Sequence, residues 1–110
     1  MRTRRFATAI LVALISAVLL TATLAAPADA ATRTTWNRLA KCESGGRWHI
    51  NTGNGYYGGL QFSLSTWRAY GGSGLPSSHS REEQIAIAKK VQAAAGWGQW
   101  PACSRKAGLR

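Results

Sequence analysis

Hydrophobic residues recur at helical spacing in two stretches of the chain. The first stretch predicts a short helix over 36–43, which begins at a Thr34-Thr35 cap and ends at Gly45-Gly46. Residues on one face of this helix are spaced i, i+3, i+4 and i+7, and they are Trp36, Leu39, Ala40 and Glu43. We therefore expect the carboxyl group of Glu43 to point towards the interior or the wall of a cleft.

The second stretch predicts a longer helix that starts after Ser80 and runs to about residue 95. Ser80 and Glu83 match a capping box, in which the two side chains satisfy backbone N–H groups of the first helical turn. The predicted apolar stripe consists of Ile87, Ala88, Val91, Ala94 and Ala95. Glu82 and Glu83 lie in the first turn and suit the helix dipole, so both have a structural explanation.

The segment between these helices is rich in Gly, Asn, Thr and Ser, which is typical of turns. Tyr56 to Phe62 is predicted to form a short irregular hairpin, and Ser63 can cap a short helix from Leu64 to about Tyr70. Gly53 to Gly58 matches a G-x-G-x-x-G pattern. We reject a nucleotide site there, because no strand precedes the pattern and no parallel-sheet unit fits in so short a domain.

Two further segments carry little local signal. The loop over 71–80 contains His79, which we expect to be solvated, as isolated loop histidines commonly are. The tail from Gly96 to Cys103 is expected to fold back towards Cys42, and residues 105–110 to form a frayed basic end.

The first thirty residues have the pattern of a secretory signal peptide. A positive start is followed by an uncharged stretch over 6–28 and by the small residues of Ala28-Asp29-Ala30. Cleavage is predicted after Ala30, which leaves one domain over 31–110 with a core of about 35–103. An uncleaved membrane anchor is the alternative. We expect a secreted, cell-wall-associated monomer without membrane contact after cleavage.

A domain of this size buries a modest core and often needs a covalent crosslink. The chain has two cysteines, Cys42 and Cys103, and secretion favours their pairing. The crosslink would contribute about 4 kcal/mol on the chain-entropy model. Free thiols or metal ligands are the alternative, but no CxxC or HxxxH spacing accompanies them. We expect no metal and no cofactor.

After cleavage the chain would contain 11 Lys and Arg residues and three Glu residues, which gives a net charge near +8. In a cytosolic protein this charge would indicate nucleic acid. An exported protein meets anionic wall polymers and membrane surfaces instead, so we expect no nucleic-acid partner. Charge alone does not choose among the remaining anions.

Glu43 is the candidate general acid, because the predicted mature chain has no aspartate and its other two glutamates lie in a helix cap. Burial and the negative end of the helix dipole would both raise the pKa of Glu43, as a general acid requires. A solvated residue at a frayed helix end is the plain alternative. The many Trp and Tyr residues suggest a carbohydrate ligand.

Five blocks along the predicted domain form the most specific pattern in the chain. They lie at 36–48, around Cys42-Glu43-Ser44-Gly45-Gly46, at 50–62, at Ser65-Thr66-Trp67, at 81–86, and at 96–103 with Gly96-Trp97-Gly98 and Trp100-Pro101. In this order they resemble the catalytic domain of the resuscitation-promoting factors. The resemblance covers nearly the whole predicted mature chain.

The resemblance implies a small lysozyme-like domain of the α+β class, mainly α, with a short irregular hairpin and a Cys42–Cys103 disulfide. It implies cleavage of the β-1,4 bond between N-acetylmuramic acid and N-acetylglucosamine in peptidoglycan, and regrowth of dormant cells. Glu43 takes the catalytic position, Thr66 that of a conserved threonine and Tyr56 that of a groove tyrosine. Ala95 stands where many relatives have a glutamine, and loop 71–80 is shorter than in many of them.

Glu43 acting alone predicts a lytic transglycosylase, since ordinary glycosidases use two carboxylates. A lysozyme-type hydrolase is the close alternative. A non-catalytic peptidoglycan-binding signalling domain and a cationic membrane- or wall-disrupting peptide are others. The expected partners are glycan strands, with a cell-wall endopeptidase as the candidate protein partner. The predicted substrate-binding residues are Thr66, Tyr56, Asn51, Gln61, Trp48 and Trp67.

Overall fold

The computed structural model describes residues 26–110, with side chains from residue 33 onwards. The chain divides into two units, Met1–Arg33 and Thr34–Arg110, and the second holds the fold described below. Most of the predicted signal peptide, residues 1–25, lies outside the described residues. Among the described helices, none is both long and apolar enough to cross a membrane.

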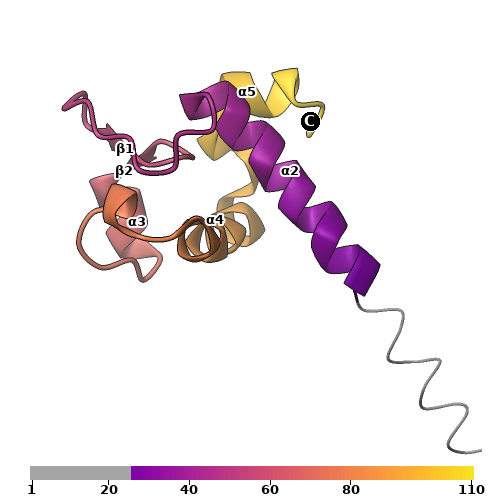
Figure 1. The fold of residues 1–110 in the computed structure, drawn as a ribbon, viewed down its shortest axis with the longest axis horizontal. Coiled ribbons are helices and arrows are strands. Elements are labelled where there is room, and N and C mark those ends of the chain that lie inside the picture. Colours follow the sequence, from indigo (N-terminus) through magenta and orange to yellow (C-terminus); the bar gives the residue numbers. More distant parts are fainter. Residues whose placement is uncertain (1–25) are drawn as a thin grey trace, which may run out of the picture. The chain divides into compact units, whose positions relative to one another are not determined.

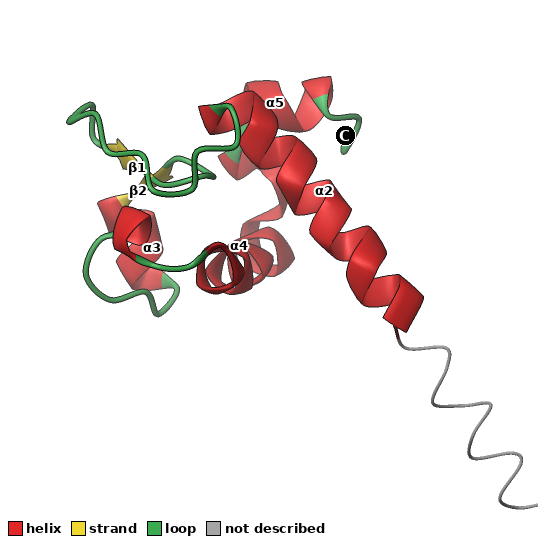
Figure 2. Cartoon of the chain, in the orientation of Figure 1, coloured by secondary structure: helices red, strands yellow, loops and turns green. Residues whose placement is uncertain are grey.

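Helices dominate the second unit, and two short strands form a hairpin between them (Figures 1 and 2). The elements in chain order are α2 (Ala26–Ser44), β1 (Tyr56–Tyr57), β2 (Phe62–Ser63), α3 (Leu64–Ala69), the 3-10 helix η1 (Pro76–Ser78), α4 (Arg81–Ala95), the 3-10 helix η2 (Gly96–Gln99) and α5 (Pro101–Lys106). The strands pair antiparallel, with Tyr56 opposite Ser63 and Tyr57 opposite Phe62. The predicted class, mainly α with a short hairpin and one disulfide, is confirmed.

Helix α2 differs from its prediction at one end only. The Thr34-Thr35 cap is wrong, because the helix begins at Ala26 and continues through both threonines. The alanine-rich run before them favours a helix, and it includes the predicted cleavage point after Ala30. The end at Gly45-Gly46 is confirmed: Gly45 N donates to Lys41 O at 3.0 Å and Gly46 N to Ala40 O at 3.1 Å. Both glycines have positive φ, as this type of helix end requires.

The two predicted serine caps are both present. Ser63 Oγ accepts from Thr66 N at 3.3 Å at the start of α3, and Ser80 Oγ accepts from Glu83 N at 3.1 Å at the start of α4. His79 is partly exposed to solvent, and both nitrogens of its ring also have hydrogen-bond partners. Its Nδ1 lies 2.6 Å from Glu83 Oε2, and its Nε2 lies 2.6 Å from the carbonyl oxygen of Ser73.

Hydrogen bonds to acceptors on both sides favour the doubly protonated ring of His79. The Glu83 carboxylate and then the Ser73 carbonyl raise the pKa of His79, and the bond from His79 lowers the pKa of Glu83. His79 thereby ties the loop at Ser73 to the first turn of α4.

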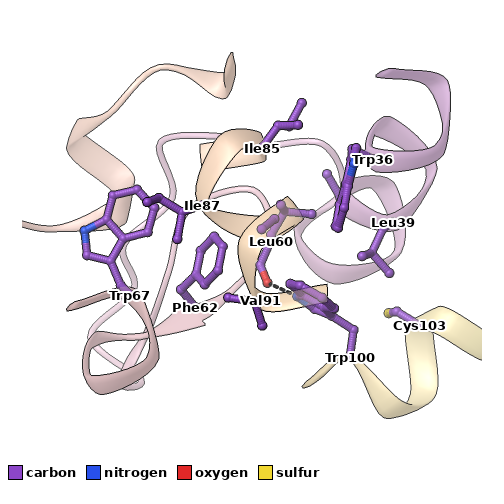
Figure 3. Packing of buried hydrophobic residues seen from close by; sticks show 12 residues of the cluster. Trp36, Leu39, Leu60, Phe62, Trp67, Ile85, Ile87, Val91, Trp100 and Cys103 are labelled. Atoms are coloured by element: carbon purple, nitrogen blue, oxygen red, sulfur yellow. Dashed lines mark hydrogen bonds between the residues drawn. The ribbon is translucent and has the colours of Figure 1, made fainter. Parts of the chain in front are cut away.

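The hydrophobic core gathers side chains from α2, the hairpin, α3, α4 and the tail over 96–103 (Figure 3). The Trp36 ring of α2 lies 5.1 Å from the Trp97 ring and 5.5 Å from the Trp100 ring, measured between centroids. On the other side of the core, the centroids of Phe62 and Trp67 are 5.2 Å apart. The core therefore joins α2 and the hairpin to the 96–103 tail.

Two sequence predictions about packing are wrong. Ala94 and Ala95 are exposed, because the last turn of α4 extends beyond the core, and Gln84 and Ile85 are buried instead. Residues 105–110 do not form a frayed end. Leu109 N donates to Ser104 O at 2.8 Å, and the Arg110 guanidinium donates to Pro101 O at 3.1 Å.

Gln84 is the buried polar residue that connects most segments. Its side chain is fully buried, and its Oε1 accepts from Gly59 N at 3.0 Å. Its Nε2 donates to the carbonyl oxygens of Trp48 and His79, at 2.8 and 2.9 Å. A Cβ atom at Gly58 would overlap the Gln84 amide, which explains why a glycine precedes Gly59 in the turn of the hairpin. One amide thus fixes three loops to α4.

Replacement of Gln84 by leucine is expected to lower the free energy of unfolding by about 2–4 kcal/mol. Three buried or half-buried backbone groups would lose their partner while the side-chain volume stays similar. Urea unfolding of the purified variant measures the effect, with Gln92→Leu on the same helix as the matched control. Equal stability of the two variants would show that the Gln84 network contributes little.

Candidate active site

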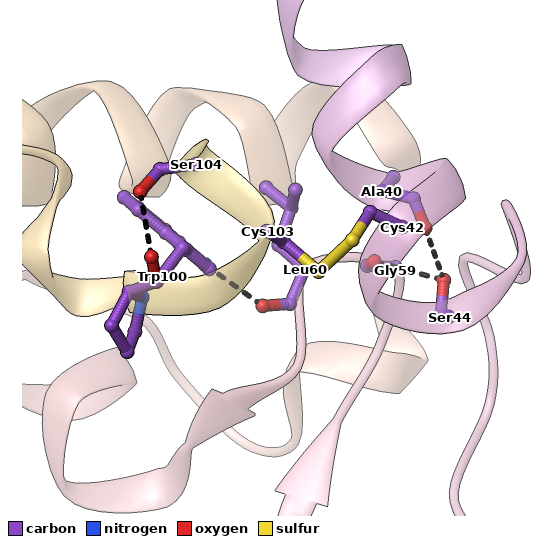
Figure 4. The surroundings of a disulfide bond; sticks show 9 residues. Ala40, Cys42, Ser44, Gly59, Leu60, Trp100, Cys103 and Ser104 are labelled. Atoms are coloured by element: carbon purple, nitrogen blue, oxygen red, sulfur yellow. Dashed lines mark hydrogen bonds between the residues drawn. A yellow bond between two sulfur atoms is a disulfide. The ribbon is translucent and has the colours of Figure 1, made fainter. Parts of the chain in front are cut away.

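Glu43 lies in the last turn of α2, and the residues on both sides of it are anchored (Figure 4). Cys42 forms a disulfide with Cys103 of α5, with the two Cα atoms 5.6 Å apart. The hydroxyl group of Ser44 lies 2.8 Å from the carbonyl oxygen of Gly59, in the turn of the hairpin, and 3.1 Å from that of Ala40. The predicted disulfide is confirmed, and the backbone at Glu43 is fixed between α5 and the hairpin.

The carboxyl group of Glu43 has an environment unlike that of the other two glutamates. It is half-buried, and burial raises its pKa. Among residues 33–110, no hydrogen bond or ion pair reaches this carboxyl group, whereas Glu82 pairs with Arg81 at 3.3 Å and Glu83 with His79 at 2.6 Å. Such a carboxyl group keeps its proton to a higher pH and can donate it to a bound substrate.

A pocket of about 190 Å³ lies at the hairpin, between α3, α4 and the tail. Its lining residues are Tyr56, Gln61, Phe62, Ser63, Thr66, Val91, Gln99 and Trp100. The pocket brings together three of the predicted substrate-binding residues, namely Tyr56, Gln61 and Thr66. Glu43 is not one of its lining residues, and it is connected to the turn beside Gln61 through the bond from Ser44 to Gly59.

Gln61 has an unusual backbone in this pocket. Its φ is +52°, and among the described residues no other non-glycine residue has a positive φ. Its side-chain Nε2 donates to Gly58 O at 3.0 Å, and the neighbouring Leu60 O accepts from Trp100 Nε1 at 2.9 Å. Backbone strain of this kind persists where surrounding contacts hold it, and it is common at binding and catalytic sites.

The other predicted binding residues lie elsewhere. Trp67 is only 1% exposed and donates from Nε1 to Ser73 O at 3.1 Å, so it belongs to the core and does not line this pocket. Trp48 is half-buried against Gly59, where a Cβ atom would overlap its ring. Asn51 is exposed and accepts from Gly53 N at 3.3 Å, which shapes its own turn. Neither Trp48 nor Asn51 lines the pocket.

Gln99 of η2 also lines the pocket, although it is not among the predicted binding residues. The sequence feature that could have indicated a binding role for Gln99 is its amide side chain between two tryptophans, in Trp97-Gly98-Gln99-Trp100. The described residues contain no group of His, Cys, Asp and Glu side chains that could hold a metal ion. The candidate site thus consists of the carboxyl group of Glu43 and, in the pocket beside the hairpin, of neutral hydrogen-bonding side chains.

Comparison with known proteins gives consistent matches. A family model for a transglycosylase-like domain matches residues 30–103. The chain is 61% identical over 84 residues to resuscitation-promoting factor Rpf of Micrococcus luteus, covering 76% of this chain and 38% of that protein. It is 59% identical over 92 residues to Rpf1 of Corynebacterium glutamicum, covering 80% and 48%. It is 54% identical over 82 residues to RpfE of Mycobacterium tuberculosis, covering 74% and 48%.

The matched region includes Glu43, both cysteines and every residue that lines the pocket. The chain spans less than half the length of these three relatives. It belongs to the family of transglycosylase-like domains and, within it, is a catalytic domain of the resuscitation-promoting factor type.

Proposed function

We propose that this protein is a secreted peptidoglycan-cleaving enzyme with Glu43 as its single catalytic carboxyl group. The bond cleaved is the β-1,4 link from N-acetylmuramic acid to N-acetylglucosamine. The observation that carries the proposal is the state of Glu43, which is half-buried, has a raised pKa and lies between two anchored neighbours. The transglycosylase-like family and the names of the relatives support the class of substrate.

The reaction needs one proton donor that later becomes a proton acceptor. Protonated Glu43 donates to the glycosidic oxygen as the bond from that oxygen to the anomeric carbon breaks. The resulting carboxylate then takes the proton of the 6-hydroxyl group of the muramic acid, whose oxygen forms the new bond to the anomeric carbon. Glu43 ends protonated, no water is consumed, and the product is a 1,6-anhydro sugar.

Glu82 and Glu83 are poor candidates for a second catalytic carboxylate. Both occupy the first turn of α4, with Arg81 and His79 as their respective partners. A lysozyme-type hydrolase, in which Glu43 activates a water molecule, uses the same single residue and is the alternative for the second half of the reaction.

The glycan strand would be held by hydrogen bonds from the pocket beside the hairpin. Tyr56, Gln61 and Thr66 are the proposed contacts, and Gln99 adds a second amide from the opposite element. Tyr56 is 51% exposed, so its ring offers a face on which a sugar can stack. The exposed Ala95 cannot make the hydrogen bond that a glutamine would make there, which lowers affinity and leaves the chemistry unchanged.

At the level of the cell, we propose that the protein acts outside the membrane on the wall and promotes regrowth of dormant cells, with a cell-wall endopeptidase as a protein partner. A non-catalytic wall-binding signal is the competing function. A wall-binding signal does not require the carboxyl group of Glu43, so the variants below distinguish it from the enzymatic function.

The variant Glu43→Gln is expected to release muropeptides from purified peptidoglycan about 10²- to 10⁴-fold more slowly than the wild type, the range for loss of a general acid. Glu82→Gln removes an equally charged carboxylate from the α4 cap and should retain activity. Chromatography of the soluble products measures both rates. Equal release by wild type and Glu43→Gln would remove Glu43 from the mechanism.

The wild-type products are expected to carry 1,6-anhydro-muramic acid ends. Their masses in mass spectrometry would each be lower by one water than those of the reducing sugars made by a muramidase. A commercial lysozyme digest of the same peptidoglycan provides the reference. Hydrated products would identify the enzyme as a hydrolase while keeping Glu43 as its acid.

The same variant should not lower the stability of the fold at neutral pH. The folded protein holds a proton on Glu43 to a pH above the ordinary value of 4.5. Stability therefore decreases as the pH rises from about 4.5 through the raised pKa. Glutamine cannot ionise, so the stability of Glu43→Gln relative to wild type should increase across this interval in urea unfolding. If the difference in unfolding free energy between Glu43→Gln and wild type stays constant from pH 4 to pH 7, the pKa of Glu43 is not raised.

A further inference from the structure

A second concave surface lies on the side of α2 that does not face the core. It is lined by five α2 residues spaced i, i+3, i+4, i+7 and i+8, which places them on one face, and by the end of α5. We name it the basic groove, with Thr34, Asn37, Arg38, Lys41 and Cys42 from α2 and Lys106 from α5. Its volume is about 510 Å³, and it shares no lining residue with the pocket beside the hairpin.

Three positive charges meet in this groove without a counter-charge. Arg38 and Lys41 are neighbours at i and i+3 on α2, and Lys106 faces them from α5. Glu82 and Glu83 lie on α4, and Glu43 directly follows Cys42 but is not a lining residue; within the unit Thr34–Arg110 no ion pair involves any of the three cations. Like charges this close repel one another, which favours occupation of the groove by an anion.

The disulfide fixes the two walls of the groove. Cys42 is itself a lining residue, and its bond to Cys103 attaches α2 to α5 three residues before Lys106. The positive charges cannot relieve their repulsion by separating the helices. A ligand therefore meets two helices whose backbones are already fixed, and only the exposed side chains of the three cations remain to be ordered.

We propose that the basic groove binds a linear polyanion that carries phosphodiester groups. The planar guanidinium of Arg38 suits two phosphate oxygens at once, and the ammonium groups of Lys41 and Lys106 serve as point charges for neighbouring phosphates. Three cations spread over two helices suit a chain with several anionic groups better than a single small anion. The site lies outside the catalytic machinery and binds independently of cleavage.

A polymer fits this surface better than a membrane does. Proteins that lie on membranes insert apolar side chains beside their basic ones. Among the described residues, the exposed large hydrophobic residue is Tyr56, and it lines the other pocket. The groove thus has the charge for a phosphate chain and lacks an apolar anchor for a bilayer.

Binding of soluble poly(glycerol phosphate) to the purified protein tests the proposal by isothermal titration calorimetry at several salt concentrations. The double variant Lys41→Gln/Lys106→Gln should bind about three- to tenfold more weakly, as the loss of two exposed ion pairs predicts, with a smaller salt dependence. The matched control, Lys89→Gln/Lys90→Gln, removes the same charge from the exposed face of α4 and should bind like wild type. Both variants should cleave polymer-free peptidoglycan at the wild-type rate.

Four results would overturn the proposal. The first is that the wild type does not bind poly(glycerol phosphate). The second is that both double variants bind it equally weakly, because the affinity would then depend only on the net charge of the protein. The third is binding of equal strength to phosphatidylglycerol vesicles that is weakened by the groove variant alone, because the ligand would then be a membrane. Poly(glutamate) as a third probe should bind more weakly than poly(glycerol phosphate), and the reverse order would exclude phosphodiester recognition.

Discussion

The turn of the hairpin at 58–61 is the constraint on which the rest of the site depends. Hydrogen bonds reach it from three different elements: from Ser44 of α2 to Gly59 O, from Gly59 N to Gln84 of α4, and from Trp100 to Leu60 O. A turn held only by its own residues could not keep Gln61 at a positive φ, because that conformation costs free energy in a residue with a side chain. The three hydrogen bonds from other elements stabilise this conformation of the turn. They also fix the position of the end of α2 relative to the pocket.

The position of Glu43 is favourable for chemistry and unfavourable for stability. A half-buried carboxyl group without a hydrogen-bond or ion-pair partner lowers the free energy of unfolding when it is ionised, and in most proteins such a group is paired. Here the two flanking residues hold the helix end in place, one by a covalent bond to Cys103 and the other by the bond to Gly59. The last turn of α2 is therefore held in place by contacts that do not involve the carboxyl group, as the role proposed for Glu43 requires.

Local sequence signals predicted the features that local interactions determine. The glycine end of α2, the caps at Ser63 and Ser80, the hairpin and the disulfide follow from residue types at short spacing, and all are present. The start of α2 was missed because the threonine cap competes with a strongly helical alanine run. Gln84 and Gln99 gave no local signal, because an amide on a helix or in a loop looks the same whether it faces water, a turn or a pocket. Burial of Trp67 likewise depends on which elements fold over it, and periodicity does not contain that information.

The disulfide and the tryptophan cluster also have a consequence for the order of synthesis. Glu43 is made early, yet the groups that fix its surroundings, Trp100 and Cys103, follow Cys42 by up to 61 positions. A chain that emerges N-terminus first carries the acid without the turn, the pocket or the crosslink. A half-made chain therefore holds Glu43 without the contacts that position it, so any function that depends on this carboxyl group has to wait for the second half of the domain and for the closed disulfide.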